Sequence, residues 1–248
     1  MNTYSELRKK IKDKKAVTTV VGLGYVGLPM ALEFARKGFR VHGLDLNSKR
    51  VQRLEKGISY INDVTDSEVA RAVKSKKFKV TDDPHVIEKT DVVIICVPTP
   101  LSKTHKPDIS YIVAATKTLS RFMKKPQLIV LESTTYPGTT REVILPLLKK
   151  KKRTLGKDFF LAFSPERIDP GNPKYNFSNI PKLIGGFTQE CTSLGKILYS
   201  HVVKKVVGLS TPEAAEVTKL LENTFRIVNI GLINEFATLC NKLGIDVW

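Results

Sequence analysis

The chain has 248 residues, of which 42% are hydrophobic, and it carries a formal net charge of +17 at pH 7. This is enough apolar material for one large α/β domain with part of a second, and too much for a disordered chain. No apolar run reaches the roughly 18 residues that a membrane-spanning helix requires, and the N-terminus lacks the apolar core of a signal peptide. We therefore expect a cytoplasmic protein without a membrane partner.

The positive charge is compatible with nucleic-acid binding, but its distribution along the chain favours solvent-exposed lysines instead. The lysines are spread along the chain, and the local runs Lys74–Lys79 and Lys149–Arg153 have no interleaved aromatic residues. A solvated helix end or loop is the favoured role for Lys149–Arg153, and we expect no nucleic-acid partner. The charge would still attract polyanions such as dinucleotides and nucleoside diphosphates.

Three cysteines lie far apart and show no metal-ligand spacing, so we expect no metal site. Cys96 falls in the apolar run Asp91–Val97, where an inert core thiol is the favoured interpretation. Cys240 lies on an apolar helical face and is interpreted in the same way.

The first 14 residues are expected to form an extension, with a short amphipathic helix that leads into the first strand. Beyond them, strand-like and helix-like stretches alternate, and the strands are apolar at nearly every position, as in a parallel sheet covered on both faces. This order predicts an α/β fold with a Rossmann-like, doubly wound, mostly parallel sheet over residues 15–210. The predicted strands are Val17–Gly22, Arg40–Leu44, Lys77–Thr81, Val92–Val97, Gln127–Glu132, Phe159–Ala162, Lys182–Gly185 and Lys204–Val207. The predicted helices are Pro29–Lys37, Lys49–Lys56, Ser67–Lys74, Ile109–Met123, Thr140–Lys150, Glu190–Ser200 and Pro212–Leu243.

A glycine-rich run, Gly22-Leu23-Gly24-Tyr25-Val26-Gly27, joins the first strand to the following helix. Such a turn aims the N–H groups of a helix N-terminus at a pyrophosphate. The second strand ends in Asp45, 18 residues after Gly27, where a carboxylate accepts hydrogen bonds from an adenosine ribose. The combination predicts a bound NAD. Asp45 favours NAD over NADP because a carboxylate would repel a 2′-phosphate, although the positive charges of Lys49 and Arg50 oppose that preference. The alternative is a turn that needs glycine only for packing.

Two further strands end in polar residues, where ligands of open α/β sheets collect. In Cys96-Val97-Pro98-Thr99-Pro100 the prolines stiffen a loop from which Thr99 can offer its hydroxyl to the cofactor; the alternative is a simple loop breaker. In LESTTYPGTT, residues 131–140, Ser133 and Thr134 either face the same crevice or cap a helix. Two such strand ends facing one crevice favour a functional role.

A third polar strand end is FSPERIDPGN, residues 163–172. Glu166 and Arg167 either form a surface ion pair of little energetic value or act in a site. In a site, Glu166 would orient a water or a proton relay, while Arg167 would contact phosphate or sugar. The residues alone do not decide between these two interpretations.

The segment Ser210-Thr211-Pro212-Glu213 predicts the capped start of a helix. Its apolar periodicity continues for about 30 residues, longer than a typical surface helix, as in helices that link domains or form dimer interfaces. We interpret residues 211–248 as the start of a central helical domain. The last five residues, from Gly244 to Trp248, predict a turn and the beginning of another helix, so we expect a fragment.

Three polar residues of this helix, Lys219, Asn223 and Arg226, are spaced i, i+4 and i+7 and therefore share one face. Such a stripe is either solvated or faces a cleft, where it would suit an oxyanion and a diphosphate. The apolar residues between them are expected to face the core; they are Leu220, Leu221, Phe225 and Ile227.

Taken together, GLGYVGLP, CVPTPL, LESTTYPGTT, SPERIDPGNP, IPKLIGG and AAEVTKLLENTFRIVNIGLINE resemble, in order and spacing, the UDP-sugar and UDP-N-acetylhexosamine 6-dehydrogenases over roughly residues 15–248. The chain looks most like the UDP-N-acetylglucosamine branch, with the UDP-N-acetylmannosamine and UDP-glucose enzymes as alternatives. The resemblance implies NAD-dependent oxidation of the sugar C6 alcohol to a carboxylate, for surface polysaccharide synthesis. A cysteine thiolate captures the aldehyde, and water hydrolyses the resulting thioester. It also implies a homodimer through the long helix.

The resemblance assigns roles to particular residues. The implied NAD contacts are Gly22, Gly24, Tyr25, Val26, Gly27, Asp45, Arg50, Thr99 and Thr134. The implied catalytic residues are Glu166 and Thr134 at the hydrolytic water, Lys219 at oxyanions or a shuttled proton, and Asn223 beside it. The implied nucleotide-sugar contacts are Glu166, Arg167, Ile168, Lys219, Asn223 and Arg226.

One departure bears on activity. Family members carry the nucleophile in a Gly-Gly-x-Cys segment downstream of the long helix, and the 248 residues contain no such segment. We expect the C-terminal UDP-binding domain to be absent as well, and the chain to bind NAD without completing the oxidation. Two rivals stay open: a β-hydroxyacid dehydrogenase relative with a lysine on the connecting helix, and a basic nucleic-acid-binding or scaffold protein that keeps the fold.

Overall fold

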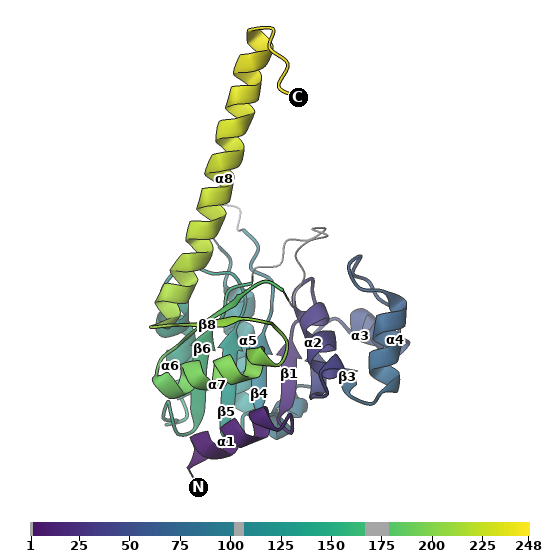
Figure 1. The fold of residues 1–248 in the computed structure, drawn as a ribbon. Helices are drawn as coiled ribbons and strands as arrows, with labels where there is room; N and C mark the ends of the chain where they lie inside the picture. The colour runs from purple at the N-terminus through teal and green to yellow at the C-terminus, as the bar shows by residue number, and fades with distance from the viewer. Residues whose placement is uncertain (1, 102–106, 167–178) are drawn as a thin grey trace.

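The computed structural model describes residues 2–101, 107–166 and 179–248. Their centre is an eight-stranded sheet in the order β3-β2-β1-β4-β5-β6-β7-β8, in which every neighbouring pair is parallel except β6 and β7 (Figure 1). This confirms the predicted doubly wound, mostly parallel α/β fold. The strands are β1 (Val17–Val21), β2 (Arg40–Leu44), β3 (Phe78–Thr81), β4 (Val92–Ile95), β5 (Gln127–Leu131), β6 (Phe159–Phe163), β7 (Lys182–Gly186) and β8 (Val206–Leu209).

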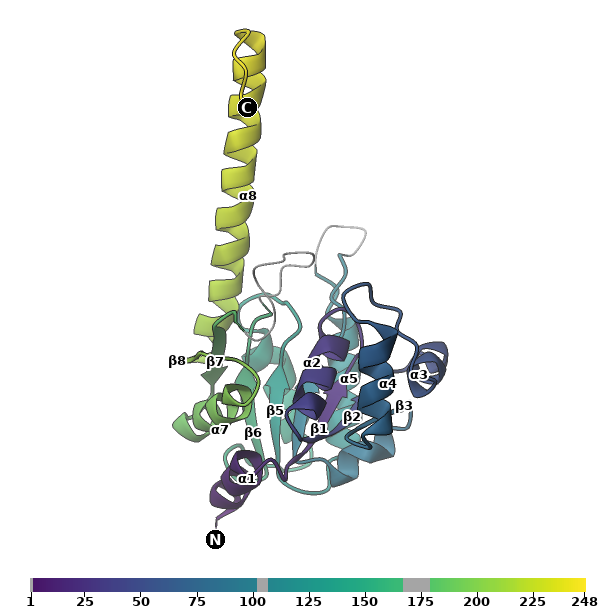
Figure 2. The same cartoon turned by 45° about the vertical axis from the view of Figure 1, so that its right-hand side comes forward.

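Helices cover both faces of the sheet, as Figure 2 shows together with Figure 1. One apolar cluster joins one face of the sheet to α1, α2, α4 and α7, and a second joins the other face to η1, α5, α6 and the start of α8. The helices are α1 (Thr3–Lys12), α2 (Gly27–Arg36), α3 (Ser48–Glu55), α4 (Asp66–Lys74), η1 (Pro84–Lys89), α5 (Ser110–Phe122), η2 (Thr140–Ile144), α6 (Leu145–Lys149), α7 (Gln189–Ser200) and α8 (Pro212–Lys242). None of these described helices is both long and apolar enough to cross a bilayer.

Strand β4 shows why the sequence predicted a doubly covered sheet. All four of its residues are buried: Val92 and Ile94 belong to the first apolar cluster, and Val93 and Ile95 to the second. Because side chains alternate across a strand, a strand buried on both faces has to be apolar at every position.

The predicted N-terminal helix is present as α1 and is amphipathic, with Leu7 and Ile11 buried. The Tyr4 hydroxyl donates to Ser193 Oγ on α7 at 3.0 Å. At the amino-terminal edge of the sheet, the ammonium groups of Lys10 and Lys125 lie 3.3 and 2.7 Å from the Asp91 carboxylate.

The helix predicted over Thr140–Lys150 is divided into two pieces. Residues Thr140–Ile144 form a π-helical turn and Leu145–Lys149 an α-helix. Pro146 lacks the N–H that an α-helical bond to the Glu142 carbonyl would need, which explains the wider turn before it.

Helix α8 stands clear of the sheet for most of its length in both ribbon views (Figures 1 and 2). Only Pro212, Ala215 and Glu216 are buried in it. The prediction that the apolar residues next to Lys219 face the core is therefore wrong for this chain; Leu220, Leu221, Phe225 and Ile227 are 40, 65, 70 and 71% exposed. Cys240, predicted to be a core thiol, is only half-buried. The apolar periodicity is present, but among residues 2–101, 107–166 and 179–248 no element buries that part of the helix.

The buried carboxylate of Glu216 fixes the base of α8. Its oxygens accept hydrogen bonds from the N–H groups of Gly138 and Thr140, at 2.6 and 2.9 Å, and from the Thr140 hydroxyl at 2.6 Å. A carboxylate that accepts from backbone N–H groups at the start of a helix is favourably placed for the helix dipole. This one side chain therefore joins α8 to the turn after β5.

We expect Glu216→Gln to lower the free energy of unfolding by about 2–3 kcal/mol, because the charge-assisted bonds are lost and an amide donor faces backbone donors. Urea denaturation followed by circular dichroism measures the change. Glu235→Gln, on the exposed part of α8, is the control and should stay within about 0.5 kcal/mol of the parent. Equal losses in the two variants would contradict the account.

Candidate functional site

The glycine turn lies between β1 and α2, and its three glycines meet three different surroundings. Gly22 has φ +88°, and a Cβ there would lie 2.8 Å from the Cys96 carbonyl oxygen. At Gly27 a Cβ would lie 1.8 Å from the Gly22 oxygen, whereas at Gly24 it would meet nothing within 4 Å. The first and third glycines are thus required by packing, and the middle one leaves the backbone open to a ligand, as a pyrophosphate requires.

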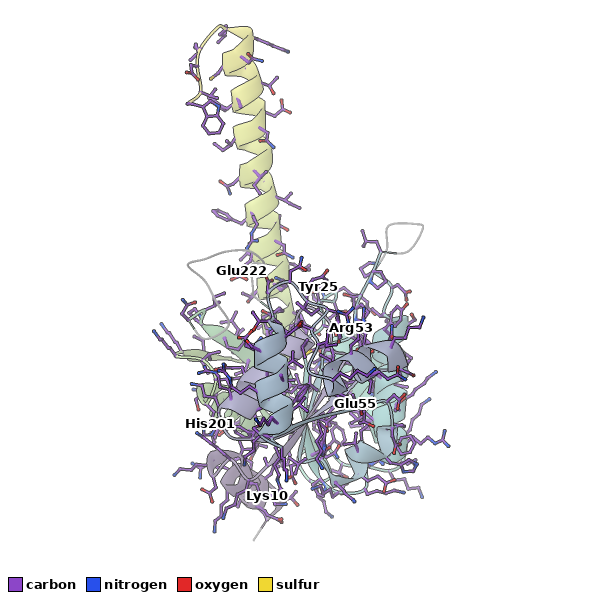
Figure 3. All side chains as sticks on the ribbon, turned by 90° about the vertical axis from the view of Figure 1, so that its right-hand side faces the viewer. Lys10, Tyr25, Arg53, Glu55, His201 and Glu222 are labelled. Carbon is purple, nitrogen blue, oxygen red and sulfur yellow. The ribbon has the colours of Figure 1, made fainter. Side chains whose placement is uncertain are left out.

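The backbone donors after this turn face the same opening. Within the described ranges, the N–H groups of Gly24, Tyr25 and Val26 donate to no other part of the chain. Val26, the N-cap of α2, makes no side-chain capping bond. Unpaired donors and the positive end of a helix dipole together form an anion-binding site. Figure 3 shows the 71% exposed Tyr25 and Glu222 of α8 on the side of the sheet body from which α8 rises, with Lys10 on the opposite side of that body.

Asp45 lies beside the turn, at the end of β2, and is only 7% exposed. Its Oδ2 accepts from the Leu23 N–H and its Oδ1 from the Asn47 N–H, both at 2.9 Å. The Arg50 guanidinium lies 3.7 Å from Oδ2. Since each carboxylate oxygen has two lone pairs, Asp45 keeps capacity for ribose hydroxyls. The structure thus brings Asp45 to the glycine turn, as the spacing predicted, and Arg50 lies beside it.

The polar ends of β4 and β5 lie side by side. The Ser133 hydroxyl donates to the Val97 carbonyl at 2.7 Å and so ties the two strand ends together. Ser133 is therefore not a helix cap; the N-cap of η2 is Thr139. Thr99 is half-buried and Thr134 is exposed, so both side chains reach the carboxyl edge of the sheet.

A buried group of charged residues at this edge was missed by the sequence interpretation. Lys182 Nζ lies 2.6 Å from Glu132 Oε2, 3.5 Å from Glu166 Oε2 and 3.3 Å from the Pro165 carbonyl oxygen. The Tyr199 hydroxyl donates to the other oxygen of Glu132. The available signal was a glutamate directly after one all-apolar strand and a lysine at the start of another.

Burial decides the electrostatics of this group. It raises the pKa of Glu132 to about 7, against the opposing effect of the Lys182 ammonium. Burial lowers the pKa of Lys182, but the carboxylates of Glu132 and Glu166 outweigh that effect and the net shift is upward. Burial also raises the pKa of the Cys96 thiol well above its usual range, which agrees with an inert thiol.

The polar stripe of α8 begins one turn beyond its buried base. Lys219 and Asn223 are half-buried and Arg226 is exposed. The other two predicted substrate contacts, Arg167 and Ile168, lie outside the described residues. At the opposite edge of the sheet no predicted site residue is found among those described.

Comparison with known proteins decides the family. Residues 16–203 match the NAD-binding domain of the UDP-glucose/GDP-mannose dehydrogenase family, and residues 213–248 match its central domain. The chain belongs to this family. Its first matched domain is the NAD-binding domain of that family, which confirms the predicted cofactor.

Among the relatives, the UDP-N-acetyl-D-glucosamine 6-dehydrogenase of Pseudomonas aeruginosa is 39% identical over 239 residues, 95% of this chain and 55% of the relative. The solved structure of the UDP-D-ManNAc dehydrogenase of Pyrococcus horikoshii gives a TM-score of 0.87 at 37% identity, over 93% of this chain and 55% of that one. The chain thus spans about half the length of the relatives it matches. A 3-hydroxyisobutyrate dehydrogenase from Mycobacterium tuberculosis, 18% identical with a TM-score of 0.66, shows only the shared fold.

We expect Asp45→Ala to weaken NAD binding by about 1–2 kcal/mol, or roughly five- to thirtyfold in Kd, because charge-assisted hydrogen bonds are lost. Isothermal titration calorimetry measures the affinity. Asp63→Ala, at an exposed position, serves as the control and should bind as the parent does. Unchanged affinity in Asp45→Ala would remove this residue from the site.

Glu132 should make stability depend on pH in a defined direction. A carboxyl group whose pKa is raised on folding adds stability below its unfolded pKa of about 4.5 and loses it as pH rises through about 7. The parent should therefore lose stability relative to Glu132→Gln between these two pH values. Urea denaturation across the range tests this, and a constant or opposite difference would contradict it. Carbon-13 NMR of labelled glutamate should also show a titration near pH 7 that Glu132→Gln removes.

Proposed function

We propose that the protein serves the NAD-dependent oxidation of the C6 alcohol of a UDP-N-acetylhexosamine to the uronic acid, in surface polysaccharide synthesis, with UDP-N-acetylglucosamine favoured. The observation that carries the proposal is the meeting of the glycine turn, Asp45 and the buried Glu132–Lys182–Glu166 group at one edge of the sheet. The relatives that act on UDP-N-acetyl-D-glucosamine and on UDP-D-ManNAc support this substrate class. The UDP-N-acetylmannosamine and UDP-glucose substrates are the alternatives.

In this proposal, one set of site residues binds the cofactor and another set binds the sugar. NAD supplies the acceptor for hydride from C6 when it is bound. The Gly22–Gly27 turn would hold its pyrophosphate, and Asp45 and Arg50 its adenosine ribose. Thr99 and Thr134 would contact it at the ends of β4 and β5.

On the sugar side, Glu166 would orient the hydrolytic water, with Thr134 beside it. Lys219 would stabilise negative charge on the oxygen at C6 or move its proton, and Asn223 would support the same centre. Arg167, Ile168 and Arg226 would bind the nucleotide sugar. In the same proposal residues 1–14 form an extension, residues 15–210 the NAD-binding unit, and residues 211–248 belong to the central unit.

The test is a panel of nucleotide sugars with the NAD-loaded protein, in which NADH absorbance reports the first hydride transfer. This step precedes capture of the aldehyde by a cysteine and does not require the Gly-Gly-x-Cys segment, and no uronic acid is expected. UDP-N-acetylglucosamine should give more NADH than UDP-N-acetylmannosamine or UDP-glucose. Lys219→Ala should lower the initial rate by about a hundredfold while the Kd for NAD is kept. Lys242→Ala, at the exposed end of α8, is the matched control and should react as the parent does.

The rivals predict other outcomes of the same panel. NADH from a β-hydroxyacid but from no nucleotide sugar would favour the β-hydroxyacid dehydrogenase relative. Salt-dependent binding of duplex DNA tighter than the binding of NAD would favour the basic nucleic-acid-binding protein.

The proposal includes a homodimer through α8. Exposed apolar residues continue along this helix, among them Phe225, Ile233 and Phe236, at 70, 65 and 57%. We expect Phe236→Glu to weaken self-association by at least about tenfold, because a charge would be buried in the interface. Sedimentation equilibrium measures it, with Asn241→Glu on the same helix as the control. A protein that stays monomeric at all concentrations would contradict this partner.

A further inference from the structure

The peptide groups on both sides of Leu23 are held by side chains from outside the glycine turn. The Leu23 N–H donates to Asp45 Oδ2 at 2.9 Å. Its carbonyl oxygen accepts from the Tyr60 hydroxyl at 2.7 Å. Tyr60 comes from the loop between α3 and α4 and belongs to none of the motifs that predicted the site.

The rigidity of the peptide bond extends this contact to the next residue. In a planar trans peptide the C=O of Leu23 and the N–H of Gly24 point in opposite directions. A hydroxyl that fixes the Leu23 carbonyl therefore turns the Gly24 N–H away from Tyr60. Gly24 is the residue with open space at its α-carbon, and its N–H donates to no other described part of the chain.

The Tyr60 side chain is itself well fixed. The guanidinium carbons of Arg50 and Arg53 lie 5.3 and 6.0 Å from the centre of its ring. Arg53 also donates to the Ser59 carbonyl at 2.5 Å, which anchors the loop. Burial raises the pKa of Tyr60 to about 12, so its hydroxyl stays a donor at neutral pH.

We infer that Tyr60 is a positioning residue of the NAD site, which aims the Gly24 N–H at the cofactor's pyrophosphate by holding the Leu23 carbonyl. Asp45 holds the preceding peptide, so the two side chains together orient the centre of the glycine turn. Without the hydroxyl, the Leu23–Gly24 peptide is free to rotate. Ordering this peptide then reduces the free energy of NAD binding. The inference rests on NAD binding by this domain and not on the identity of the sugar.

The test is Tyr60→Phe, which keeps the ring beneath Arg50 and removes only the hydroxyl. Tyr4→Phe is the matched control, since it removes a hydroxyl that donates to Ser193 at 3.0 Å, far from the turn. We expect Tyr60→Phe to raise the Kd for NAD roughly three- to tenfold, the value of one hydrogen bond, while Tyr4→Phe leaves it unchanged. Calorimetry measures both, and urea denaturation measures their stabilities.

Two further readouts separate positioning from a general loss of stability. ADP, which has the pyrophosphate but no nicotinamide, should lose the same factor as NAD. In the free protein, the amide NMR signal of Gly24 should move in Tyr60→Phe and stay in place in Tyr4→Phe. A Kd for NAD within twofold of the parent, an equal rise in both variants, or a loss for NAD without one for ADP would overturn the inference. A parent chain that binds no NAD would instead overturn the assignment of the cofactor site.

Discussion

The contact between the glycine turn and the end of β4 is the constraint on which the rest of the site depends. Gly27 lies so close to the Gly22 carbonyl, and Gly22 to the Cys96 carbonyl, that neither position has room for a side chain. This packing sets the N-terminus of α2 above β1 and β4, with its free N–H groups directed at the carboxyl edge of the sheet. Asp45 reaches the same turn only because β2 pairs with β1 in register, Leu44 beside Val21.

The charges at this edge are buried at a cost in desolvation. A buried ion pair such as Glu132–Lys182 gives up much of its Coulomb energy to desolvation, and an apolar pair of similar volume is often no less stable. The pair also fixes geometry, because Lys182, at the start of β7, contacts both Glu132, next to the end of β5, and the Glu166 carboxylate. Glu216 does the same for α8, whose polar stripe begins one turn later.

Much of the fold and part of the site could be predicted from the sequence. Uniformly apolar strands and the glycine spacing depend on local chemistry, so the strands, the doubly wound sheet and the approach of Asp45 to the turn were predicted correctly. The buried lysine–glutamate group joins residues 50 positions apart, and Tyr60 reaches Leu23 over 37, so no local pattern reveals either contact. The apolar face of α8 was wrongly assigned to the core of this chain. Apolar periodicity shows that one face of a helix is suited to burial, but it does not show which element buries it.

The most direct measurement is a crystal structure of the protein with NAD. The account predicts the pyrophosphate within hydrogen-bonding distance of the Gly24, Tyr25 and Val26 N–H groups, and the adenosine ribose on the Asp45 carboxylate. NAD bound elsewhere, or side chains filling the space above Gly24 while NAD stays in solution, would contradict it.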